Sequence, residues 1–396
     1  MKILLINKFH YLRGGAERAY FDTARILEER GHEVAFFSMK HPQNIQTPWS
    51  KYFVQNVDYR AQYTIFQQFH LGLGMIWNRE AQKNLSLLLD AFQPDVVHLH
   101  NIYHQLSPSI IPTIKKRDIP LVMTLHDYKL ICPNYSLFVR GNIWEGGAFR
   151  CMTDRCIRNA FVPSVLCSLE RIFHEMIGVY RKVDTFLSPS LFLKEKFQEH
   201  GFLGDIEIVS QPIQQIKEEG SAHHKEHILY AGRLSEEKGI DVLLSALTQT
   251  PRLSLRVAGD GPKRVYLKKL AKKLSIENQV SFLGHLGNRE IKEELAQAKA
   301  LVIPSVWYEN MPYALTEALG SGQVVIASRL GGMTERIVHG ENGFLFEKGN
   351  VEELATLLKS LEGKDLSSLR EKARESVKDL NEKRYYQQLM KMYQKK

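Results

Sequence analysis

The chain has 396 residues, of which 44% are hydrophobic and 24% are charged. These values are typical of a soluble globular protein with two to three domains, and four cysteines in this length exclude a disulfide scaffold. The net charge is +9, with 24 basic against 18 acidic residues in 1–200 (+6) and 29 against 26 in the remainder (+3). This excess permits an anionic partner, but it lacks the basic stripe with interleaved aromatics that is typical of nucleic-acid binding.

The first residues favour a buried strand over a signal peptide. The apolar run 3–6 is short and meets Asn7 and Lys8, which a secretory segment would not tolerate. No run of about 18 apolar residues predicts a transmembrane helix. We therefore expect a cytoplasmic protein, with peripheral contact at the inner membrane surface as an alternative.

The first half alternates short apolar runs with helical patterns. Strands are predicted at 2–7, 32–39, 95–100, 121–125 and 185–188. A glycine loop at 13–17 precedes a helix at 19–30, which ends at Gly31. Strands that alternate with helices predict βαβ units and a parallel sheet.

The second half repeats this pattern. Strands are predicted at 227–230, 253–258, 280–283, 300–304, 324–327 and 343–346, with helices at 240–247 and 263–274. Residues 211–226 are polar and lack apolar periodicity, so they are predicted to form a linker. The α/β architecture that follows is two Rossmann-like, doubly wound domains facing each other across a cleft, with boundaries 1–210 and 227–381. The segment 382–396 has aromatic residues at helical spacing.

Two acids lie beside the predicted strand at 300–304. Glu309 falls in the loop that follows the strand, and Glu317 lies about one turn into a helix that Pro312 can start. Ligands bind open α/β sheets beyond the carboxyl ends of the strands, so both acids can meet the hydroxyls of a sugar or a ribose. Taken alone, each would be an ordinary acid of a first helical turn.

Two cations follow the first strand of the second half. Arg233 and Lys238 lie in the loop and at the start of the next helix, where backbone N–H groups also point outward. Such a combination predicts a diphosphate site, since Arg binds bidentately and Lys binds as a point charge. Isolated surface cations would be the simpler interpretation, but the combination with Glu309 and Glu317 argues for a site.

Two further features lie in the first half. Gly14 and Gly15 stand where the first strand meets the first helix, so they allow close approach of a phosphate or form a tight turn. They lack the further glycine of the dinucleotide fingerprint. His126 follows the strand at 121–125 and can contact a sugar or simply pack beside a loop. His98, His100 and His104 have no obvious carboxylate or cysteine nearby in sequence, so no metal site is predicted.

Two segments are assigned to structure rather than chemistry. Cys132, Cys151, Cys156 and Cys167 do not match a zinc spacing, and we expect unpaired structural thiols, with zinc as the minor alternative. The segment 161–180 places apolar residues on one helical face: Val162, Val165, Leu166, Leu169, Ile172, Phe173 and Met176. A face of this kind can dock on a membrane, but a core-facing helix is favoured.

Taken together, the motifs resemble glycosyltransferase family 4. The resemblance rests on Gly14-Gly15-Ala16-Glu17, Gly232-Arg233 through Lys238-Gly239, Gly259-Asp260-Gly261-Pro262, Phe282-Leu283-Gly284, and Glu309 with Glu317-Ala318. It extends through nearly the whole chain and is most secure over 227–350. One departure is Met333 after Gly331-Gly332, where members of the family often have proline.

The resemblance implies a GT-B fold and transfer from a nucleotide sugar with retention of configuration, usually without a metal or other cofactor. By position, Arg233 and Lys238 would bind the donor diphosphate, and Glu317 the ribose. Glu309 would bind the transferred sugar, with backbone help from Asn310, Met311 and Pro312. Gly14 and Gly15 would approach the phosphates from the other domain, and His126 would reach the sugar or reacting centre. The resemblance also implies that the segment 382–396 packs back on the first domain.

The expected function is therefore transfer from a UDP-sugar to a saccharide or lipid-linked acceptor, as in cell-surface polysaccharide or glycolipid synthesis. A sugar-nucleotide epimerase of similar fold and a non-catalytic nucleotide-sugar-binding protein are the alternatives. The acceptor is expected at the first domain, where an aromatic-rich stretch contains Tyr59, Tyr63, Phe66, Phe69 and Trp77.

Overall fold

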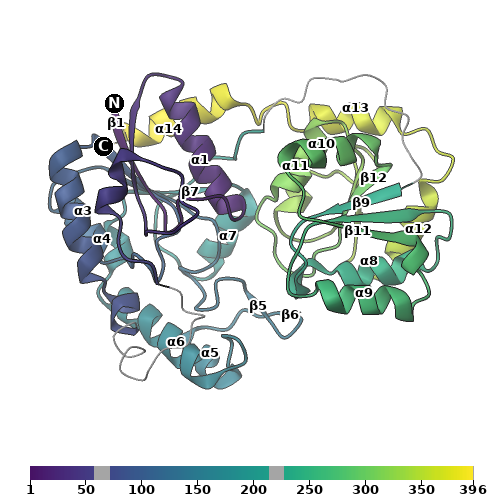
Figure 1. Cartoon of the computed structure of the whole chain (residues 1–396), viewed down its shortest axis with the longest axis horizontal. Coiled ribbons are helices and arrows are strands. Elements are labelled where there is room, and N and C mark those ends of the chain that lie inside the picture. The colour runs from purple at the N-terminus through teal and green to yellow at the C-terminus, as the bar shows by residue number, and fades with distance from the viewer. Residues whose placement is uncertain (58–71, 214–226, 396) are drawn as a thin grey trace. The chain divides into compact units, whose positions relative to one another are not determined.

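The structure, a computed structural model, describes residues 1–57, 72–213 and 227–395 and divides into two compact units (Figure 1). Unit 1 comprises residues 1–137, 145–211 and 382–396, and unit 2 comprises 138–144 and 212–381. Most of the predicted linker and the aromatic residues Tyr59, Tyr63, Phe66 and Phe69 lie outside the described residues.

Unit 1 contains a six-stranded parallel sheet in the order β2-β1-β3-β4-β7-β8. The strands are β1 (Lys2–Ile6), β2 (Glu33–Phe37), β3 (Val96–Leu99), β4 (Leu121–Thr124), β7 (Thr185–Ser188) and β8 (Ile206–Ile208). β3, β4 and β7 are buried along their whole length, as expected for parallel strands covered on both faces. The strands predicted from the sequence are confirmed, whereas β8 was missed because Glu207 interrupts its short run and leaves no continuous apolar stretch.

The helices of unit 1 include long amphipathic helices and short turns. They are α1 (Gly15–Glu28), η1 (Pro48–Tyr52), α3 (Arg79–Phe92), α4 (Ile110–Lys115), α5 (Ala148–Asp154), α6 (Phe161–Met176), η2 (Val179–Lys182), α7 (Leu191–Glu199) and α14 (Glu382–Tyr393). The first helix begins at Gly15, four residues earlier than predicted, with Gly14 as its N-cap. Gly15 therefore belongs to the first helical turn rather than to a loop.

The last helix, α14, packs on the sheet of unit 1 beside α1, although it follows the whole of unit 2 in sequence (Figure 1). The hydroxyls of Tyr385 and Thr23 are 2.6 Å apart, and Tyr393 shares a 2.7 Å hydrogen bond with His98 inside the sheet. Aromatic residues with polar ends suit this position, since their rings fill the core while their hydroxyls find buried partners.

Unit 2 contains a second six-stranded parallel sheet, in the order β11-β10-β9-β12-β13-β14. Its strands are β9 (His227–Ala231), β10 (Ser254–Ala258), β11 (Val280–Gly284), β12 (Ala300–Ile303), β13 (Val325–Ser328) and β14 (Phe344–Phe346). The six predicted strands are confirmed within one or two residues. The two-stranded hairpin β5 (Phe138–Val139) and β6 (Asn142–Ile143) also groups with this unit, whereas the sequence placed it in the first domain.

Helices cover both faces of the unit 2 sheet (Figure 1). One face packs against α8 (Ile240–Leu247), α9 (Arg264–Lys273) and α12 (Val351–Ser360). The other packs against α10 (Asn288–Gln297), α11 (Tyr313–Gly320) and α13 (Ser367–Glu375). Short 3-10 turns complete the unit: η3 (Glu236–Lys238), η4 (Glu277–Gln279) and η5 (Gly331–Glu335). The architecture is two Rossmann-like units of the GT-B class.

Two structural predictions from the sequence are wrong. Cys151 and Cys156 form a disulfide, which a five-residue separation across the end of α5 permits, while Cys132 and Cys167 are buried free thiols as expected. Helix α6 does not turn its apolar stripe to the core, because Leu169 and Met176 are among its exposed residues. No helix among the described residues combines the length and apolar character needed to cross a bilayer.

Candidate active site

The sheet of unit 2 reverses its strand order between β9 and β12. β9 pairs with β10 on one side and with β12 on the other, so the loops that leave the carboxyl ends of β9 and β12 diverge. A crevice at such a switch point is where open α/β sheets bind ligands. The first loop contains Arg233 and Lys238, and the second contains Glu309.

Lys238 and Glu309 form an ion pair at this switch point. Lys238 Nζ donates to Glu309 Oε1 at 2.6 Å, and Ser305 Oγ donates to the same oxygen at 2.6 Å. The Lys238 side chain is 21% exposed and that of Glu309 is 7% exposed. The sequence assigned Lys238 to the donor diphosphate and Glu309 to the transferred sugar. The structure brings the two side chains into direct contact, although 71 positions separate them in the sequence.

The ionisation of Glu309 depends on this contact. Burial by itself would raise the pKa of Glu309, but the Lys238 ammonium and the hydrogen bonds from Lys238 and Ser305 outweigh it and lower the pKa. Glu309 is therefore a carboxylate at neutral pH. A buried carboxylate with fixed geometry is suited to accept hydrogen bonds from ligand hydroxyls. Ser305, which was not predicted, lies two residues after the end of β12, and only this position near the strand end could have indicated a role.

Glycines allow both loops to approach this closely. Gly239 has φ of +62°, and a Cβ there would collide with the carbonyl of Pro304 at the end of β12. Gly331 has φ of +65°, and a Cβ there would collide with the backbone of Glu309. The next residue, Gly332, donates its N–H to Glu309 O at 2.8 Å, which fixes the loop that holds Glu309. Met333, in place of the proline expected from the resemblance, is buried beneath this turn.

The other predicted residues of this unit lie on the same two chain segments as Lys238 and Glu309. Arg233 is exposed on the loop after β9, and Glu317 is half-buried within α11. Pro312 is the N-cap of α11, so the segment Asn310-Met311-Pro312 leads directly into the helix N-terminus. Backbone N–H groups in the first turn of a helix lack intrahelical partners and attract anions. The loop therefore offers a carboxylate and a helix N-terminus within a few residues of each other.

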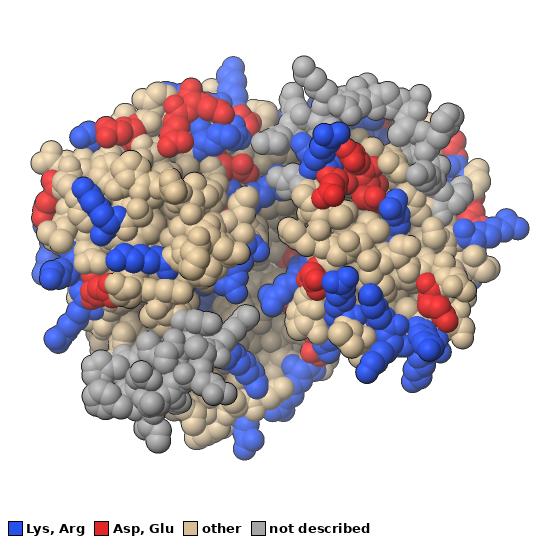
Figure 2. Space-filling view, viewed as in Figure 1, with Lys and Arg blue, Asp and Glu red and all other residues tan. Residues whose placement is uncertain are grey.

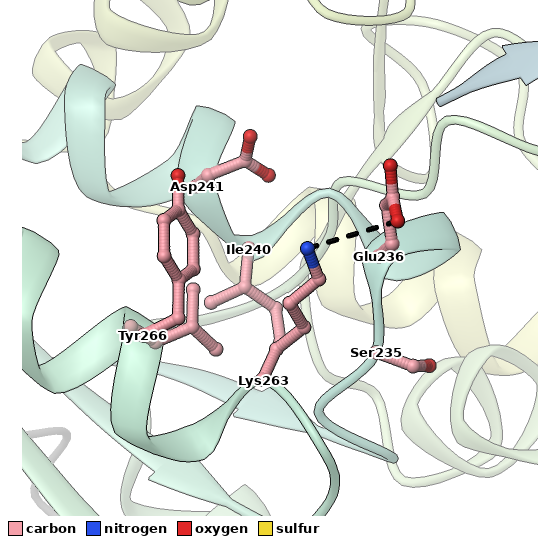
Figure 3. Close-up of a pocket in the computed structure, with 7 residues that line it drawn as sticks. Ser235, Glu236, Ile240, Asp241, Lys263 and Tyr266 are labelled. Atoms are coloured by element: carbon pink, nitrogen blue, oxygen red, sulfur yellow. Dashed lines mark ion pairs between the residues drawn. The ribbon is translucent and has the colours of Figure 1, made fainter. Parts of the chain in front are cut away.

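A pocket of about 150 Å³ lies next to the loop after β9 but apart from the Lys238–Glu309 pair (Figure 3). It is lined by Ser235, Glu236, Ile240, Asp241, Lys263, Tyr266 and Leu267. Lys263 Nζ lies 3.7 Å from Glu236 Oε2, and both side chains are substantially exposed, so this ion pair contributes little stability. None of the predicted donor-binding residues lines this pocket, and we do not assign the donor to it.

Unit 1 places a column of histidines at the carboxyl ends of β3 and β4. His100 Nδ1 and His126 Nε2 share a hydrogen bond of 2.9 Å, and the His98 ring stacks on that of His100. Burial, with a smaller effect from the Lys8 ammonium, lowers the pKa of His126 to about 3, and burial lowers the pKa of His98 to about 3. His126 is therefore neutral at pH 7, and it can exchange hydrogen bonds but holds no charge there.

A second polar group surrounds the end of β1. Lys8 interacts electrostatically with Asp127 and Glu17, and burial lowers the pKa of Lys8 despite these acids. Burial raises the pKa of both Glu17 and Asp127. Glu17 lies in the first turn of α1, next to Gly14 and Gly15. The sequence singled out the glycines but not Lys8, whose position after an apolar strand was the available signal.

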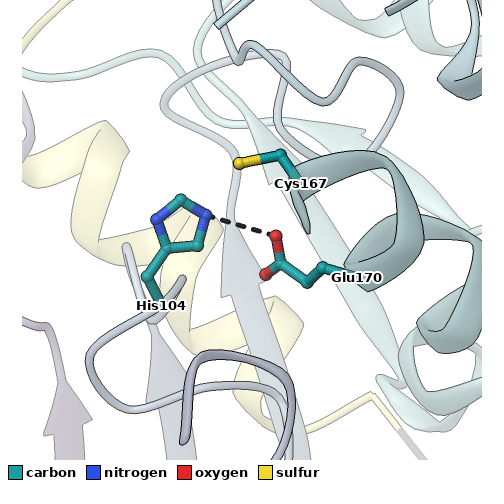
Figure 4. Close-up of side chains that lie close together, drawn as sticks. All are labelled: His104, Cys167 and Glu170. Carbon is teal, nitrogen blue, oxygen red and sulfur yellow. Dashed lines mark ion pairs between the residues drawn. The ribbon is translucent and has the colours of Figure 1, made fainter. Parts of the chain in front are cut away.

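The structure brings a cysteine and a carboxylate close to His104, although neither lies near it in the sequence. His104, Cys167 and Glu170 place their possible ligand atoms within 4.8 Å of one another, and they come from a loop and from α6 (Figure 4). Sequence spacing could not show this, because Cys167 and Glu170 lie more than 60 positions after His104. Lys129 Nζ, however, donates to Glu170 Oε2 at 2.7 Å. A metal ion would have to displace this buried ammonium, so the residues do not fit a metal site.

Known protein families match both halves of the chain. The description "Glycosyltransferase Family 4" matches residues 13–214, just over half of the chain, and "Glycosyl transferases group 1" matches residues 213–380. The N-acetyl-alpha-D-glucosaminyl L-malate synthase of Bacillus anthracis is 25% identical over 378 residues, which cover 92% of this chain and 89% of that protein.

Solved structures agree in fold. Sucrose-phosphate synthase from Thermosynechococcus elongatus superposes with a TM-score of 0.75 at 17% identity, over 99% of this chain and 98% of the other. HepE from Anabaena, in complex with UDP, superposes with a TM-score of 0.69 at 18% identity, over 99% of each chain. At such low identity the similarity is one of fold.

Proposed function

The chain belongs to glycosyltransferase family 4, and we propose that this glycosyltransferase moves a sugar from a UDP-sugar to a hydroxyl of a saccharide or lipid-linked acceptor with retention of configuration. The observation that carries the proposal is the Lys238–Glu309 pair at the β9/β12 switch point. The HepE structure contains UDP, which supports uracil as the base of the donor. Synthesis of cell-surface polysaccharide or glycolipid is the setting that we propose.

The donor diphosphate is assigned to Arg233 and Lys238. When the bond between the sugar C1 and the phosphate oxygen breaks, negative charge develops on that oxygen. A fixed ammonium, a guanidinium and a helix N-terminus stabilise this charge without reorganising, which is the largest contribution that an enzyme can make to such a step. Lys238 already has one anionic partner in Glu309, so its ammonium is held in position before the donor arrives.

The sugar and ribose are assigned to the two acids. Glu309, ionised and held by Ser305, accepts hydrogen bonds from hydroxyls of the transferred sugar. Glu317 in α11 accepts from the ribose hydroxyls, and the backbone of Asn310, Met311 and Pro312 contacts the sugar or the phosphate. These roles rest on the positions of the residues around the switch point and on the family resemblance.

Gly14, Gly15 and His126 are assigned to the same reaction from unit 1. Gly14 has an extended backbone with φ of −171°, and a Cβ there would meet only Glu17 Oε2, at 3.7 Å. Neither conformation nor crowding within the unit requires glycine at this position, which supports a role in admitting a ligand. His126, neutral because burial lowers its pKa to about 3, is a hydrogen-bond partner for the sugar or the reacting centre.

The chemical step that we propose needs no protein nucleophile. The acceptor oxygen attacks the sugar C1 from the face that the phosphate leaves, the C1–phosphate oxygen bond breaks, and the acceptor proton passes to the leaving phosphate. Arg233 and Lys238 supply positive charge at that phosphate, so we also propose that the reaction requires no metal ion or other cofactor.

The test begins with wild-type protein. Thermal shift with UDP-glucose, UDP-galactose, UDP-N-acetylglucosamine and GDP-mannose should identify a stabilising uridine donor, since a ligand at 100 times its Kd adds about 2.7 kcal/mol. That donor is then incubated with saccharide and lipid-linked acceptors in EDTA, and the anomeric configuration of the product is determined by NMR. We expect a retained linkage and undiminished turnover.

The other outcomes separate the alternatives. Conversion of the donor into a second nucleotide sugar without any acceptor would identify an epimerase. Saturable donor binding without turnover on the whole acceptor panel would favour a non-catalytic binding protein. Loss of turnover in EDTA, restored by a divalent ion, would overturn the metal-free mechanism while leaving the transferase assignment intact.

A further inference from the structure

Helix α6 exposes an apolar stripe and buries a mostly polar face, which is the reverse of an ordinary surface helix. Val162, Leu166, Leu169 and Met176 are 64%, 37%, 48% and 74% exposed. Their spacings of four, three and seven residues place them on one stripe of the helix. The opposite face is buried and mostly polar: Ser164, Cys167, Ser168, Glu170 and His174. A helix that covers a core normally presents the reverse arrangement.

Buried polar contacts hold α6 in this orientation. Glu170 accepts a 2.7 Å hydrogen bond from Lys129, and His174 Nε2 lies 2.8 Å from the carbonyl oxygen of Ile76. Ser164 Oγ bonds to the backbone at the start of the helix. Rotating α6 to bury its apolar stripe would break these contacts and leave the Lys129 ammonium buried without its counter-ion, which is very unfavourable. The exposed stripe is therefore fixed by the fold.

The apolar surface continues beyond the stripe. α5 packs on α6, and Phe149 on α5 is 76% exposed. Phe161 and Ile177, at the two ends of α6, are also exposed. Single exposed apolar residues are ordinary on protein surfaces, but a continuous group of this kind marks an interaction surface. We refer to these seven residues as the α5–α6 face: Phe149, Phe161, Val162, Leu166, Leu169, Met176 and Ile177.

Positive charge surrounds the α5–α6 face. Residues 148–182 contain six Lys and Arg against three Asp and Glu, and one of those acids, Glu170, is buried against Lys129. The exposed cations are Arg150, Arg155, Arg158, Arg181 and Lys182. A second copy of the chain would bring like charges together across the face. An apolar stripe between cations instead complements the boundary between acyl chains and anionic headgroups.

We propose that the α5–α6 face docks unit 1 on the surface of a bilayer that contains anionic phospholipid. The apolar side chains enter the boundary between headgroups and acyl chains, and the arginines contact lipid phosphates. This docking is independent of transferase chemistry, because none of the residues assigned to the donor or to the reaction lies on the face.

The test measures vesicle binding of the full chain without any sugar substrate. Wild-type protein should co-sediment with vesicles of phosphatidylcholine and phosphatidylglycerol (7:3) and much less with pure phosphatidylcholine. Leu169→Gln/Met176→Gln removes two apolar contacts, and we expect a loss of at least about tenfold in the partition coefficient. Arg155→Asn/Arg158→Asn removes two cations, and each is expected to contribute about fivefold at an anionic surface. Asn is chosen because both positions have positive φ, which Asn tolerates.

Matched variants control for general effects. Leu203→Gln/Val338→Gln removes two exposed apolar residues elsewhere and should bind vesicles like the wild type. Lys268→Gln/Lys272→Gln removes two cations from α9 in unit 2, the helix over which Figure 2 shows basic side chains gathered. An equal loss in the α9 variant would move the docking surface to unit 2 and overturn the proposal.

Three other results would contradict it. The first is wild-type protein that fails to bind the anionic vesicles. The second is a wild-type dimer that Leu169→Gln/Met176→Gln converts to a monomer, which would make the face an interface between copies. The third is a large loss of thermal stability in that variant without any vesicle binding by the wild type. That result would indicate that another part of the chain covers the face.

Discussion

Each unit contains a lysine–glutamate pair of nearly the same length, in opposite environments. Lys129 and Glu170 in unit 1 are 2.7 Å apart, with side chains 6% and 2% exposed. Lys238 and Glu309 in unit 2 are 2.6 Å apart, with side chains 21% and 7% exposed. The first pair joins a loop to a helix inside the fold, and the second lies at a strand switch point where ligands bind. The comparison teaches that solvent access, rather than geometry, separates a structural ion pair from a candidate binding site.

The pKa values of the unit 1 pair show that its two charges depend on each other. Burial alone would lower the pKa of Lys129, but Glu170 outweighs it and raises that pKa. Burial would likewise raise the pKa of Glu170, but Lys129 and His104 lower it well below its usual range. Both partners are thus charged inside the protein, and each depends on the other. Lys238 retains a path to solvent, so a ligand phosphate can reach it while Glu309 keeps it in place.

The largest effect is expected when the unit 1 pair is broken. Lys129→Met leaves the Glu170 carboxylate buried without its ammonium, which should destabilise unit 1 by about 3–5 kcal/mol. Hydrogen–deuterium exchange of β3 and β4 measures this loss locally. Lys129→Met/Glu170→Leu removes both charges and should regain much of the stability. If the single variant is as stable as the wild type, the pair does not hold α6 in its inverted orientation.

Breaking the unit 2 pair should affect activity more than stability. Lys238→Ala removes a charge-assisted phosphate contact of about 1.5–3 kcal/mol, which corresponds to a loss of roughly 10- to 150-fold in kcat/KM for the donor. Lys272→Ala on α9 removes the same charge from an exposed site and should leave kcat/KM unchanged. If Lys238→Ala instead loses as much stability as Lys129→Met but keeps the wild-type kcat/KM for the donor, then the Lys238–Glu309 pair also stabilises the fold and does not bind the donor.

The two pairs also show what sequence can predict. Arg233, Lys238, Glu309 and Glu317 were proposed as site residues because each follows a strand within a short loop or the next helix, where position along the chain limits position in space. Both sheets, and all their strands except β8, were predicted from apolar runs that alternate with helical patterns. The Lys129–Glu170 pair was not, since its partners are 41 residues apart and meet only when α6 packs.

Helix α6 shows why apolar periodicity can mislead. Its stripe was correctly located, but periodicity identifies a face without saying what covers it. The orientation of α6 depends on the contact between Glu170, on its buried face, and Lys129. No local sequence pattern predicts that contact. The disulfide between Cys151 and Cys156 was missed for a related reason, because spacing alone does not determine whether two side chains turn toward each other.

The most gradual effect that we expect is a pH dependence that arises in unit 1. Burial lowers the pKa of His98 to about 3, whereas the unfolded chain takes up this proton near pH 6.5. Between these values the unfolded state binds more protons, so the free energy of unfolding is fully retained above about pH 6.5 and falls as the pH is lowered. The slope should be about 1.4 kcal/mol per pH unit for this histidine.

Hydrogen exchange of β3 and β4 at several pH values between 4.5 and about 7 reports this slope in the unit where it arises. His98→Gln should make the slope shallower by about 1.4 kcal/mol per pH unit, even though it also loses the hydrogen bonds to Tyr393 and Thr124. His285→Gln, at an exposed position in unit 2, should leave the slope unchanged. An unaltered slope in His98→Gln would mean that His98 is not the group that takes up the proton. The pH sensitivity of unit 1 in this range would then come from its other buried histidines, such as His126, whose pKa burial also lowers to about 3.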